Sequence, residues 1–213
     1  MKLLSRYLPK AGRALEVGCG SARFLCRVGR AAPLSLTALD NEPVALQLAE
    51  DTAGAFGVKI EAVQGDVQAL PFADDSFDLI LSGGLLEHFE DPKVVLREMV
   101  RVIRPGGIFY ADVVPRKTSW YRHGEARRML ESPWLAPGVY ESSFGPNDYG
   151  QWLAEFGLEH VRLTTCGVYP RVIERLPSWV RRAVARCLEP LDGGAAAAKW
   201  GWYFVIVGRK LSA

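Results

Sequence analysis

The sequence predicts an α/β fold, in which helices pack on both faces of a parallel sheet. Short apolar runs alternate with helical patterns over residues 13–113. Most of these runs are almost continuously hydrophobic, as expected of parallel strands that are buried on both faces. The chain has 213 residues, of which 49% are hydrophobic and 23% charged, so we expect a single domain over 1–213 with a sizeable core.

Each strand in this first part is predicted at a short apolar run bounded by turn residues. These strands cover 13–17, 35–39, 59–64, 78–82 and 107–113. The helices predicted between them cover 22–31, 43–54 and 92–104. The third helix has Pro92 in its first turn and apolar residues at helical spacing, and Pro105, Gly106 and Gly107 are expected to end it.

The pattern changes after Pro115. Residues 116–145 are rich in aromatic, proline and charged residues with weak periodicity, so we expect an insertion over the carboxyl edge of the sheet. The later elements predicted are a helix over 147–156 and strands over 158–163 and 202–207. Asn147 is the expected N-cap of that helix and Gly157 its C-terminal glycine. The Gly/Ala run 193–198 is expected to be a linker.

A second addition, an amphipathic segment, is predicted over about 171–192. Its apolar side contains Leu176, Trp179, Val180, Ala183 and Val184, and its arginines are Arg171, Arg175, Arg181, Arg182 and Arg186. Such a segment can lie in a membrane interface, with Trp at headgroup level and arginines near anionic lipid. The favoured reading is a surface helix whose apolar side packs on the core, because Glu174 and Glu189 dilute the positive charge.

Composition excludes several functional classes. The 26 basic and 24 acidic residues give a net charge of +2, so no strong global field attracts nucleic acid, and no nucleic-acid partner is expected. The four cysteines form no CxxC pair, so no metal site is expected, and scattered thiols indicate a reducing cytoplasm. Residues 1–12 contain no long apolar run and do not resemble a signal peptide. We therefore expect a cytoplasmic protein, with peripheral membrane contact through 171–191 as the open alternative.

A glycine-rich turn follows the first predicted strand and leads into a helix. Residues 16–22 read Glu-Val-Gly-Cys-Gly-Ser-Ala. Gly18 and Gly20 have no Cβ, so the turn can be tight and a ligand can approach the backbone. The N-terminus of the next helix offers N–H groups to a polar ligand. A glycine turn without a ligand has the same appearance, so this motif alone is weak evidence.

Carboxylates follow the second and third predicted strands. Asp40 lies 20 residues after Gly20, where a carboxylate can accept hydrogen bonds from both ribose hydroxyls; with Asn41 it can also cap a helix. Asp66 could accept from an exocyclic amino group while Val67 packs on a purine, although an ordinary turn aspartate is the alternative. Because successive parallel strands end at one edge of a sheet, this spacing predicts a nucleoside site.

Several segments, in the correct order, resemble the class I S-adenosylmethionine-dependent methyltransferases, in particular the small-molecule branch (methyltransferase type 11) that includes quinone-biosynthesis enzymes. These segments cover 14–24, 38–43, 64–92 and 96–115, with weaker resemblance over 144–158 and 203–210. The resemblance implies a Rossmann-like three-layer sandwich around a seven-stranded, mostly parallel sheet with an antiparallel last strand. It also implies S-adenosyl-L-methionine as the cofactor and methyl transfer as the reaction.

The resemblance further implies which residues bind the cofactor. They are Glu16, Gly18, Cys19, Gly20, Asp40, Asn41, Asp66, Val67, Ser82 and Gly83. The methionine part is expected at the glycine turn, which Glu16 supports, the ribose at the second strand end and the adenine at the third. Ser82 and Gly83, after the fourth strand, are expected beside the sulfonium.

The sequence departs from the family pattern in two places. Ala22 stands where the family usually has a third glycine, and its extra methyl group is expected to fit. The chain before the first strand is short. Residues 2–8 are the only candidate for the helical cover that family members often carry over the cofactor.

The expected mechanism is in-line methyl transfer. Because a sulfonium methyl group is already activated, the protein mainly aligns a nucleophile and excludes water. A base is needed only for a protonated acceptor; His88 is the candidate, although an orienting or structural histidine is favoured, and His160 is expected to be structural. The candidate substrate residues, Trp120, Tyr121, His123 and Tyr140, lie in the insertion and suit a largely apolar acceptor, unless they only pack the lid.

Two other functions are kept as alternatives. A nicotinamide-dependent oxidoreductase needs GxGxxG, but Arg23 stands at the third glycine position. Ala22 and the short N-terminus leave room for a non-catalytic nucleoside-binding regulatory module. Residues 82–85 lack the Asn/Asp-Pro-Pro-aromatic motif of many nucleic-acid amino methyltransferases, and no Pro-Cys pair is present, so a small-molecule or lipid-like acceptor is expected.

Overall fold

The computed structural model describes residues 4–114, 140, 142–168 and 177–212. The elements of the first half are η1 (Leu4–Arg6), β1 (Gly12–Val17), α1 (Arg23–Ala31), β2 (Leu34–Asp40), α2 (Pro43–Phe56), β3 (Glu61–Gln64), β4 (Phe77–Gly83), η2 (Leu86–His88), α3 (Pro92–Val102) and β5 (Ile103–Val113). Those of the second half are α5 (Pro146–Glu155), β6 (Leu158–Cys166), α6 (Ser178–Leu188), η4 (Glu189–Leu191), α7 (Ala195–Trp200) and β7 (Tyr203–Lys210).

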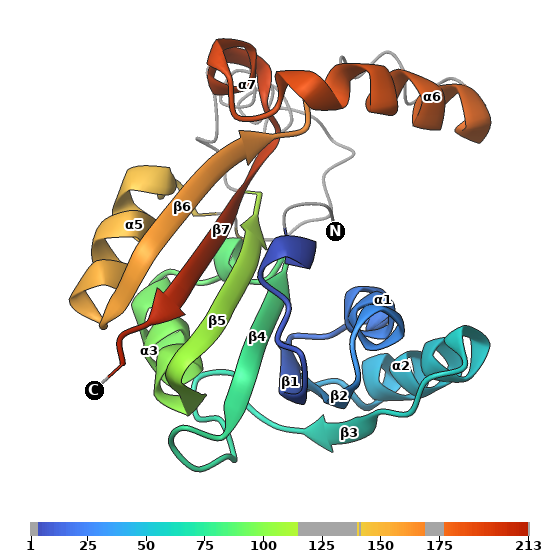
Figure 1. The fold of residues 1–213 in the computed structure, drawn as a ribbon, viewed down its shortest axis with the longest axis vertical. Helices are drawn as coiled ribbons and strands as arrows, with labels where there is room; N and C mark the ends of the chain where they lie inside the picture. Colours follow the sequence, from blue (N-terminus) through green and yellow to red (C-terminus); the bar gives the residue numbers. More distant parts are fainter. Residues whose placement is uncertain (1–3, 115–139, 141, 169–176, 213) are drawn as a thin grey trace.

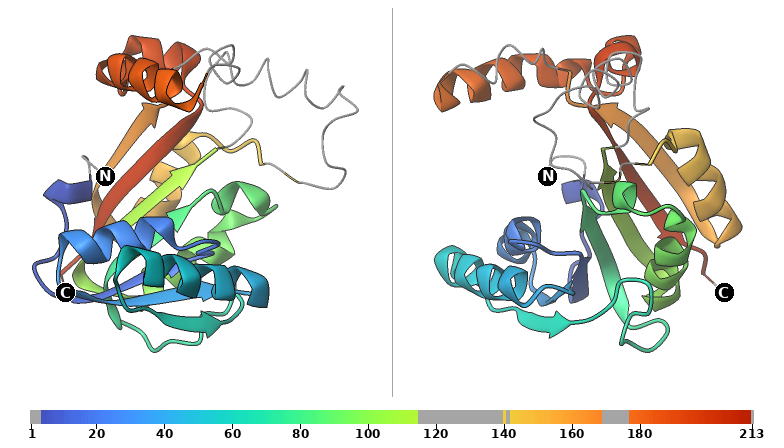
Figure 2. Two further views of the ribbon diagram at one scale, coloured as in Figure 1. Left: turned by 90° about the vertical axis from the view of Figure 1, so that its right-hand side faces the viewer. Right: turned by 180° about the vertical axis from the view of Figure 1, so that it is seen from behind.

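The seven strands form one sheet in the order β3-β2-β1-β4-β5-β7-β6. The pairs among β1 to β5 are parallel, whereas β7 runs antiparallel to both of its neighbours, β5 and β6. Helices α1 and α2 lie on one face of the sheet, and α3 and α5 lie on the other (Figures 1 and 2). The predicted three-layer sandwich with an antiparallel last strand is therefore confirmed.

The central strands are buried on both faces, which explains their nearly continuous hydrophobic sequences. On β1, Leu15 joins the hydrophobic cluster beneath α3 and α5, and its neighbour Ala14 joins the cluster beneath α1 and α2. On β5, Phe109 and Ile108 divide between the two clusters in the same way. Because side chains alternate along a strand, the residues at the carboxyl ends also divide between the two faces.

The third predicted helix is shorter than expected. It was predicted to reach residue 104, but α3 ends at Val102 and β5 begins at Ile103. A proline disfavours helical geometry in the residue before it, so Pro105 keeps Arg104 out of the helix. The Pro-Gly-Gly sequence therefore lies within the start of β5, where Gly106 has a φ of 76° and the register with β4 shifts between Phe77 and Leu79.

The predicted N-cap of α5 was wrong. The cap is Gly145, and α5 begins at Pro146, whose fixed φ suits the first helical position. The carboxylate of Asp148 accepts the N–H of Gly145 at 2.7 Å, so the first turn is capped from inside the helix. The predicted C-terminal glycine is confirmed: Gly157 has a φ of 89°, and its N–H donates to the carbonyl of Ala154.

The linker predicted over 193–198 was also wrong. Residues from Ala195 onward form α7, and Ala197 is completely buried. Alanine has the highest intrinsic helix propensity, so a run of four alanines forms a helical turn once it can pack. The glycines precede this helix, and Gly194 occupies its N-cap position.

The amphipathic segment contains α6, which lies beyond the ends of β6 and β7 in every view (Figures 1 and 2). Trp179 on this helix is 69% exposed, Ala183 is exposed, and Val180 is half-buried. The expected apolar side is thus not fully packed on the core. Within the described part of the chain, no helix is both long and apolar enough to cross a membrane.

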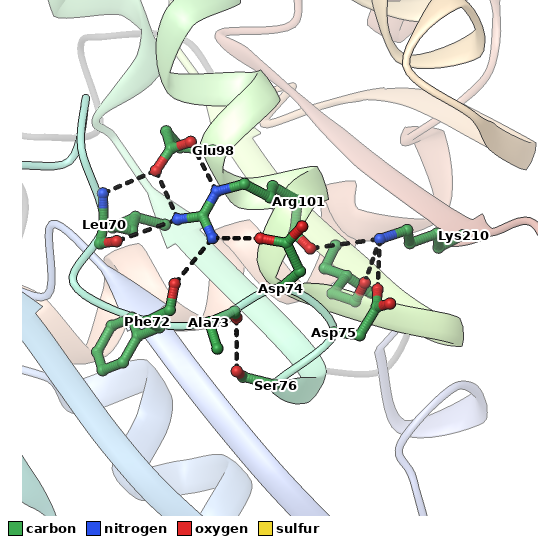
Figure 3. A network of polar contacts seen from close by, with 10 residues as sticks. Leu70, Phe72, Ala73, Asp74, Asp75, Ser76, Glu98, Arg101 and Lys210 are labelled. Atoms are coloured by element: carbon green, nitrogen blue, oxygen red, sulfur yellow. Dashed lines mark hydrogen bonds and ion pairs between the residues drawn. The ribbon is translucent and has the colours of Figure 1, made fainter.

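A polar network fixes the loop between β3 and β4 to α3 (Figure 3). The guanidinium of Arg101 contacts the carboxylates of Glu98 and Asp74 and the carbonyl oxygens of Leu70 and Phe72, at 2.7–3.0 Å. Glu98 also accepts the N–H of Leu70 at 2.9 Å. The hydrogen bond from Arg101 lowers the pKa of Glu98, so this carboxylate stays ionised. Both backbone groups of Leu70 are held by α3, four residues after Asp66.

Lys210 connects the last strand to the same loop (Figure 3). Its ammonium group donates to Asp75 at 2.7 Å and to the carbonyl oxygens of Arg101 and Ile103 at 3.3 and 2.6 Å. Strand β7 is therefore joined at its C-terminal end to the loop and to the junction between α3 and β5.

Candidate active site

The glycine turn between β1 and α1 requires its glycines for two different reasons. Gly18 has a φ of 65°, and a β-carbon there would lie 2.7 Å from the side chain of Leu85. Gly20 has a φ of 48°, but a β-carbon there would meet nothing within 4 Å. Packing and backbone conformation thus exclude a side chain at Gly18, whereas only the left-handed backbone disfavours one at Gly20.

Ala22 adopts the left-handed conformation, with φ 49° and ψ 23°, and is completely buried. It is the N-cap of α1 and not its first helical residue, as the prediction over 22–31 had placed it. A left-handed conformation costs a residue with a Cβ about 1–2 kcal/mol, which explains why glycine suits this position. The Ala22 methyl group packs in the cluster beneath α1 and α2, and this burial offsets part of the cost.

Asp40 links the end of β2 to the glycine turn. One carboxylate oxygen accepts the N–H of Gly20 at 2.9 Å, and the other accepts the N–H of Glu42 at 3.2 Å. Each carboxylate oxygen can accept a second hydrogen bond, so these contacts leave acceptor capacity for a ligand. The capping role expected for Asp40 is present in part, because Glu42 is the N-cap residue of α2.

Asp66 lies in the turn that follows β3 and is exposed. Its carboxylate accepts the N–H of Gln68 at 2.8 Å, which is the behaviour of an ordinary turn aspartate. The N–H of Gly65 donates to the carbonyl of Asp40 at 3.1 Å, so the ends of β2 and β3 are held together. Val67 is buried, with 8% of its surface exposed.

These residues line one cavity of about 990 Å³. The predicted residues in its lining are Gly18, Cys19, Gly20, Asp40, Asn41, Asp66, Val67, Gly83 and His88. The residues that the sequence analysis missed are Ser21, Gln64, Gly65, Gln68, Gly84, Leu85 and Phe89. Each of them lies within two residues of a predicted residue along the chain, so the predicted strand ends locate the cavity and the adjoining loop residues complete its lining.

Two predicted residues do not line this cavity. Glu16 is buried and accepts the N–H of Leu25 in α1 at 3.1 Å, so it contacts the helix that follows the glycine turn. Burial raises the pKa of Glu16 to about 8, against the opposing effect of that hydrogen bond. Ser82 is 1% exposed, and its hydroxyl has no hydrogen-bond partner within the described residues. Ser82 therefore lies behind the surface of this cavity, whereas Glu16 lines a second cavity described below.

His88 lies at the rim of the cavity and is exposed. Its Nδ1 lies 2.9 Å from the carbonyl oxygen of Tyr140. A carbonyl only accepts, so this contact requires a proton on Nδ1 and leaves Nε2 of the neutral ring as an acceptor. Tyr140 is 41% exposed. The other three candidate substrate residues, Trp120, Tyr121 and His123, lie outside the described residues.

A second cavity, of about 480 Å³, adjoins the first and shares four lining residues with it. The shared residues are Cys19, Ser21, Gly83 and Gly84, and the others are Glu16, Arg23, Phe24, Arg27, Tyr110, Asp112 and Tyr203. Burial, together with Asp40 and Glu16, raises the pKa of Cys19 to about 12, so its thiol stays protonated. Asp112 was missed by the sequence analysis, although it occupies the end of the fifth predicted strand, as Asp40 occupies the end of the second.

Comparison with known proteins matches residues 15–111 to a methyltransferase domain. A probable phthiotriol/phenolphthiotriol dimycocerosates methyltransferase of Mycobacterium ulcerans is 40% identical over 48% of this chain and 40% of its own length. A chloroplastic 2-methyl-6-phytyl-1,4-hydroquinone methyltransferase of Oryza sativa is 29% identical over 79% of this chain and 42% of its own length. The chain thus spans less than half the length of these curated relatives.

Among solved structures, a putative methyltransferase from Bacillus halodurans superposes with a TM-score of 0.68 and 18% identity, over 99% of this chain and 98% of that one. This likeness extends over nearly the full length of both chains. The matched methyltransferase domain implies S-adenosylmethionine as the methyl donor. Residues 15–111 thus resemble a methyltransferase domain, and the chain shares the fold of a solved putative methyltransferase.

Proposed function

We propose that the protein transfers the methyl group of S-adenosylmethionine to a small-molecule or lipid-like acceptor. The observation that supports this most directly is the convergence of Asp40 and Asp66, from two successive strand ends, on the cavity that contains the glycine turn. Open α/β sheets bind ligands at this edge. A cavity of about 990 Å³ with two carboxylate acceptors also fits a nucleoside with a charged tail.

In this proposal each part of the cofactor has its own partners. Asp40 and Asn41 hold the ribose, and Asp66 and Val67 contact the adenine. The backbone of the turn around Cys19 holds the amino-acid end, with Glu16 fixing that turn through α1. The cofactor supplies a methyl group on a positively charged sulfur, and the protein aligns the acceptor and excludes water.

The remaining proposed roles concern the acceptor. Residues 116–145 form the lid, and Trp120, Tyr121, His123 and Tyr140 contact the acceptor. The two relatives are named as methyltransferases of a phthiotriol and of a phytyl hydroquinone, and both names describe lipid-like molecules with hydroxyl groups, which supports an acceptor of this kind. His88 is a candidate base, because the contact with Tyr140 leaves its Nε2 free to accept a proton.

Contact with a membrane surface is the second part of the proposal. The exposed Trp179 and the arginines of α6 suit the interface of an anionic bilayer, from which a lipid-like acceptor could be taken. The 69% exposure of Trp179 supports this reading over a helix whose apolar side is packed on the core.

Cofactor titration followed by an acceptor screen tests the proposed function. Calorimetry with S-adenosylmethionine, S-adenosylhomocysteine and NADH identifies the ligand class. A screen of phenols, quinone precursors and lipid-linked sugars, read by S-adenosylhomocysteine release, then identifies the acceptor. Binding of S-adenosylmethionine with turnover supports the proposal. Binding without turnover on any acceptor favours the regulatory module, and binding of NADH alone favours an oxidoreductase.

A further inference from the structure

The second cavity adjoins the first at the glycine turn, where Cys19 and Ser21 line both. It shares Gly83 and Gly84 with the first cavity, so the two spaces meet where β4 ends. Under the proposed function, on which this inference rests, the sulfonium lies beside Gly83. The second cavity therefore opens directly onto the position of the reacting methyl group.

Aromatic side chains form one wall of this second cavity. The rings of Phe24 on α1 and Tyr110 on β5 lie 4.9 Å apart at an interplanar angle of 55°. Tyr203 at the start of β7 also lines the space. Three rings around a cavity of about 480 Å³ suit a planar, largely apolar ligand.

A single carboxyl group lies at the point where the two cavities meet. A β-carbon built on Gly83 would lie 3.0 Å from Oδ1 of Asp112, so this carboxyl group rests against the backbone of Gly83. The neighbouring Gly84 donates its N–H to the carbonyl of Asp112 at 3.0 Å, which fixes the end of β5 beside the end of β4. The backbone of Asp112 is thus fixed beside the site of reaction, and its carboxyl group lies next to Gly83.

The charges around Asp112 decide its protonation. Burial, and then repulsion by Glu87, raise its pKa to about 6, and Glu16 from β1 lines the same cavity. The other titratable or charged groups that face it are Tyr110 on its own strand, Cys19 of the turn, Cys166 of β6, Tyr203 of β7, and Arg23 and Arg27 of α1. Glu16, whose pKa is raised to about 8, is mostly protonated at neutral pH, whereas Asp112 is mostly ionised.

We propose that the second cavity binds a planar phenolic acceptor between Phe24, Tyr110 and Tyr203, and that the Asp112 carboxylate removes the proton of its hydroxyl group. His88 then acts only at the rim of the first cavity. The acceptor is thus assigned to the class of phenols and hydroquinols.

The reaction balances without a further reactant. The acceptor O–H bond breaks, its proton passes to Oδ1 of Asp112, and the oxygen electron pair forms the new O–CH₃ bond as the C–S electron pair returns to sulfur. The products are a methyl ether, S-adenosylhomocysteine and a neutral Asp112. With a pKa of about 6, this acid then returns its proton to solvent at neutral pH.

An ammonium acceptor is the competing ligand, because aromatic rings beside a carboxylate also suit a cation. Two observations favour the phenol. Arg23 and Arg27 line the same cavity and repel a cation. The second carboxyl group, Glu16, is mostly neutral, so the cavity offers one negative charge and not two.

Binding measurements test the assignment without methyl transfer. The full chain, saturated with S-adenosylhomocysteine, is titrated by calorimetry with 1-naphthol, with 1-methoxynaphthalene, which lacks the hydroxyl donor, and with protonated 1-naphthylmethylamine. Wild-type protein is expected to bind 1-naphthol about ten-fold or more tightly than the methoxy compound, since a hydrogen bond to a charged group contributes about 1.5–3 kcal/mol. Asp112→Ala should remove this preference, and Asp51→Ala, which removes an exposed carboxylate on α2, should not.

A second pair of variants tests whether the ligand binds in this cavity. Phe24→Ser should weaken binding of 1-naphthol about ten-fold or more, because it removes an aromatic wall. Phe56→Ser, a half-buried ring on the same side of the sheet but outside the cavity, should not. Melting curves confirm that both variants are folded.

Several outcomes would overturn the assignment. They are equal affinity of wild-type protein for the naphthol and its methyl ether, no binding of either, an unchanged preference in Asp112→Ala, and tighter binding of the naphthylmethylammonium ion. If Asp112→Ala or Phe24→Ser weakens S-adenosylhomocysteine as much as 1-naphthol, the cavity holds the amino-acid end of the cofactor instead. If wild-type protein does not bind S-adenosylhomocysteine at all, the proposed function itself has failed.

Discussion

The carboxylate of Asp40 accepts the backbone N–H of Gly20 at 2.9 Å, across the 20 residues that separate the end of β2 from the glycine turn. The same side chain therefore shapes the turn and, under the proposed function, binds the ribose. A change at Asp40 removes both contributions together.

We predict that Asp40→Ala weakens S-adenosylhomocysteine binding by about 1–3 kcal/mol, or roughly 5- to 150-fold, because two backbone N–H groups and the ribose lose a charged acceptor. Calorimetry measures the loss, with Asp51→Ala as the exposed control on α2. Unchanged affinity in a folded Asp40→Ala protein would remove Asp40 from the cofactor site.

Ala22→Gly is expected to leave the protein almost equally stable. Glycine relieves about 1–2 kcal/mol of left-handed strain at the N-cap. The loss of the buried methyl group destabilises the folded protein by about 0.8 kcal/mol. The greater flexibility of glycine in the unfolded chain lowers the stability by about 0.4–1 kcal/mol more. Cofactor binding should be unchanged or tighter, as read by calorimetry. A binding loss of more than about ten-fold would show that the buried methyl group shapes the turn.

Arg101→Ala should destabilise the protein by about 1–3 kcal/mol, because two backbone carbonyls and two carboxylates lose their donor. The expected loss of stability is modest because the Arg101 side chain is 30% exposed, and solvent screens its ion pairs. Arg101→Lys should recover only part of the loss, since an ammonium cannot reproduce the planar fork. Urea unfolding measures the change, and an Arg101→Ala protein as stable as the surface variant Arg30→Ala would contradict it.

The stability of the protein should fall as the pH rises from about 4.5 to about 8, the unfolded and folded pKa values of Glu16. A carboxyl group whose pKa is raised by folding keeps its proton more tightly in the folded state, so its stabilising effect is present below the unfolded pKa and lost above the folded one. Asp112 adds to this trend between about 3.8 and 6. Denaturant unfolding across this range should give a flatter profile for Glu16→Gln than for wild type. Identical profiles would show that Glu16 is ionised in the folded protein.

Cosedimentation with anionic vesicles tests the membrane contact proposed for α6. We expect a pellet fraction that decreases with added salt, because screening weakens surface attraction. Replacing Arg182 and Arg186 by Glu, or Trp179 by Ala, should release the protein, whereas Val44→Ala, at an even more exposed apolar site on α2, should not. Wild-type protein that stays in the supernatant at low salt would exclude the interface.

The sequence predicted the layers of the fold well, because strands buried on both faces leave nearly continuous apolar runs. The ends of helices and strands were predicted less accurately where a proline or glycine took a different position in the element from the one expected. Pro146 began a helix that Asn147 was expected to cap, and Pro105 entered β5 instead of following a helix. The number of strands and the antiparallel last strand came from the family resemblance, and the strand order was not predicted, since local patterns do not specify which strands pair.

The candidate site was predictable to the extent that it lies at strand ends. Asp40 and Asp66 were found in this way, and the same rule applied to the fifth strand would have found Asp112. The aromatic wall could not be predicted from the sequence, because Phe24 and Tyr203 come from opposite ends of the chain. Only the folded sheet brings them to the same cavity.

The position of β7 between β5 and β6 has a consequence for how the protein is made. On the ribosome, β6 emerges before β7, yet β7 is the strand through which β6 joins the rest of the sheet. Until then the edge of β5, which contains Ile108, Phe109 and Tyr110, is unpaired and apolar. Such an edge can pair with other nascent chains, so we expect the interval before β7 emerges to be the point in biosynthesis at which chaperones matter most.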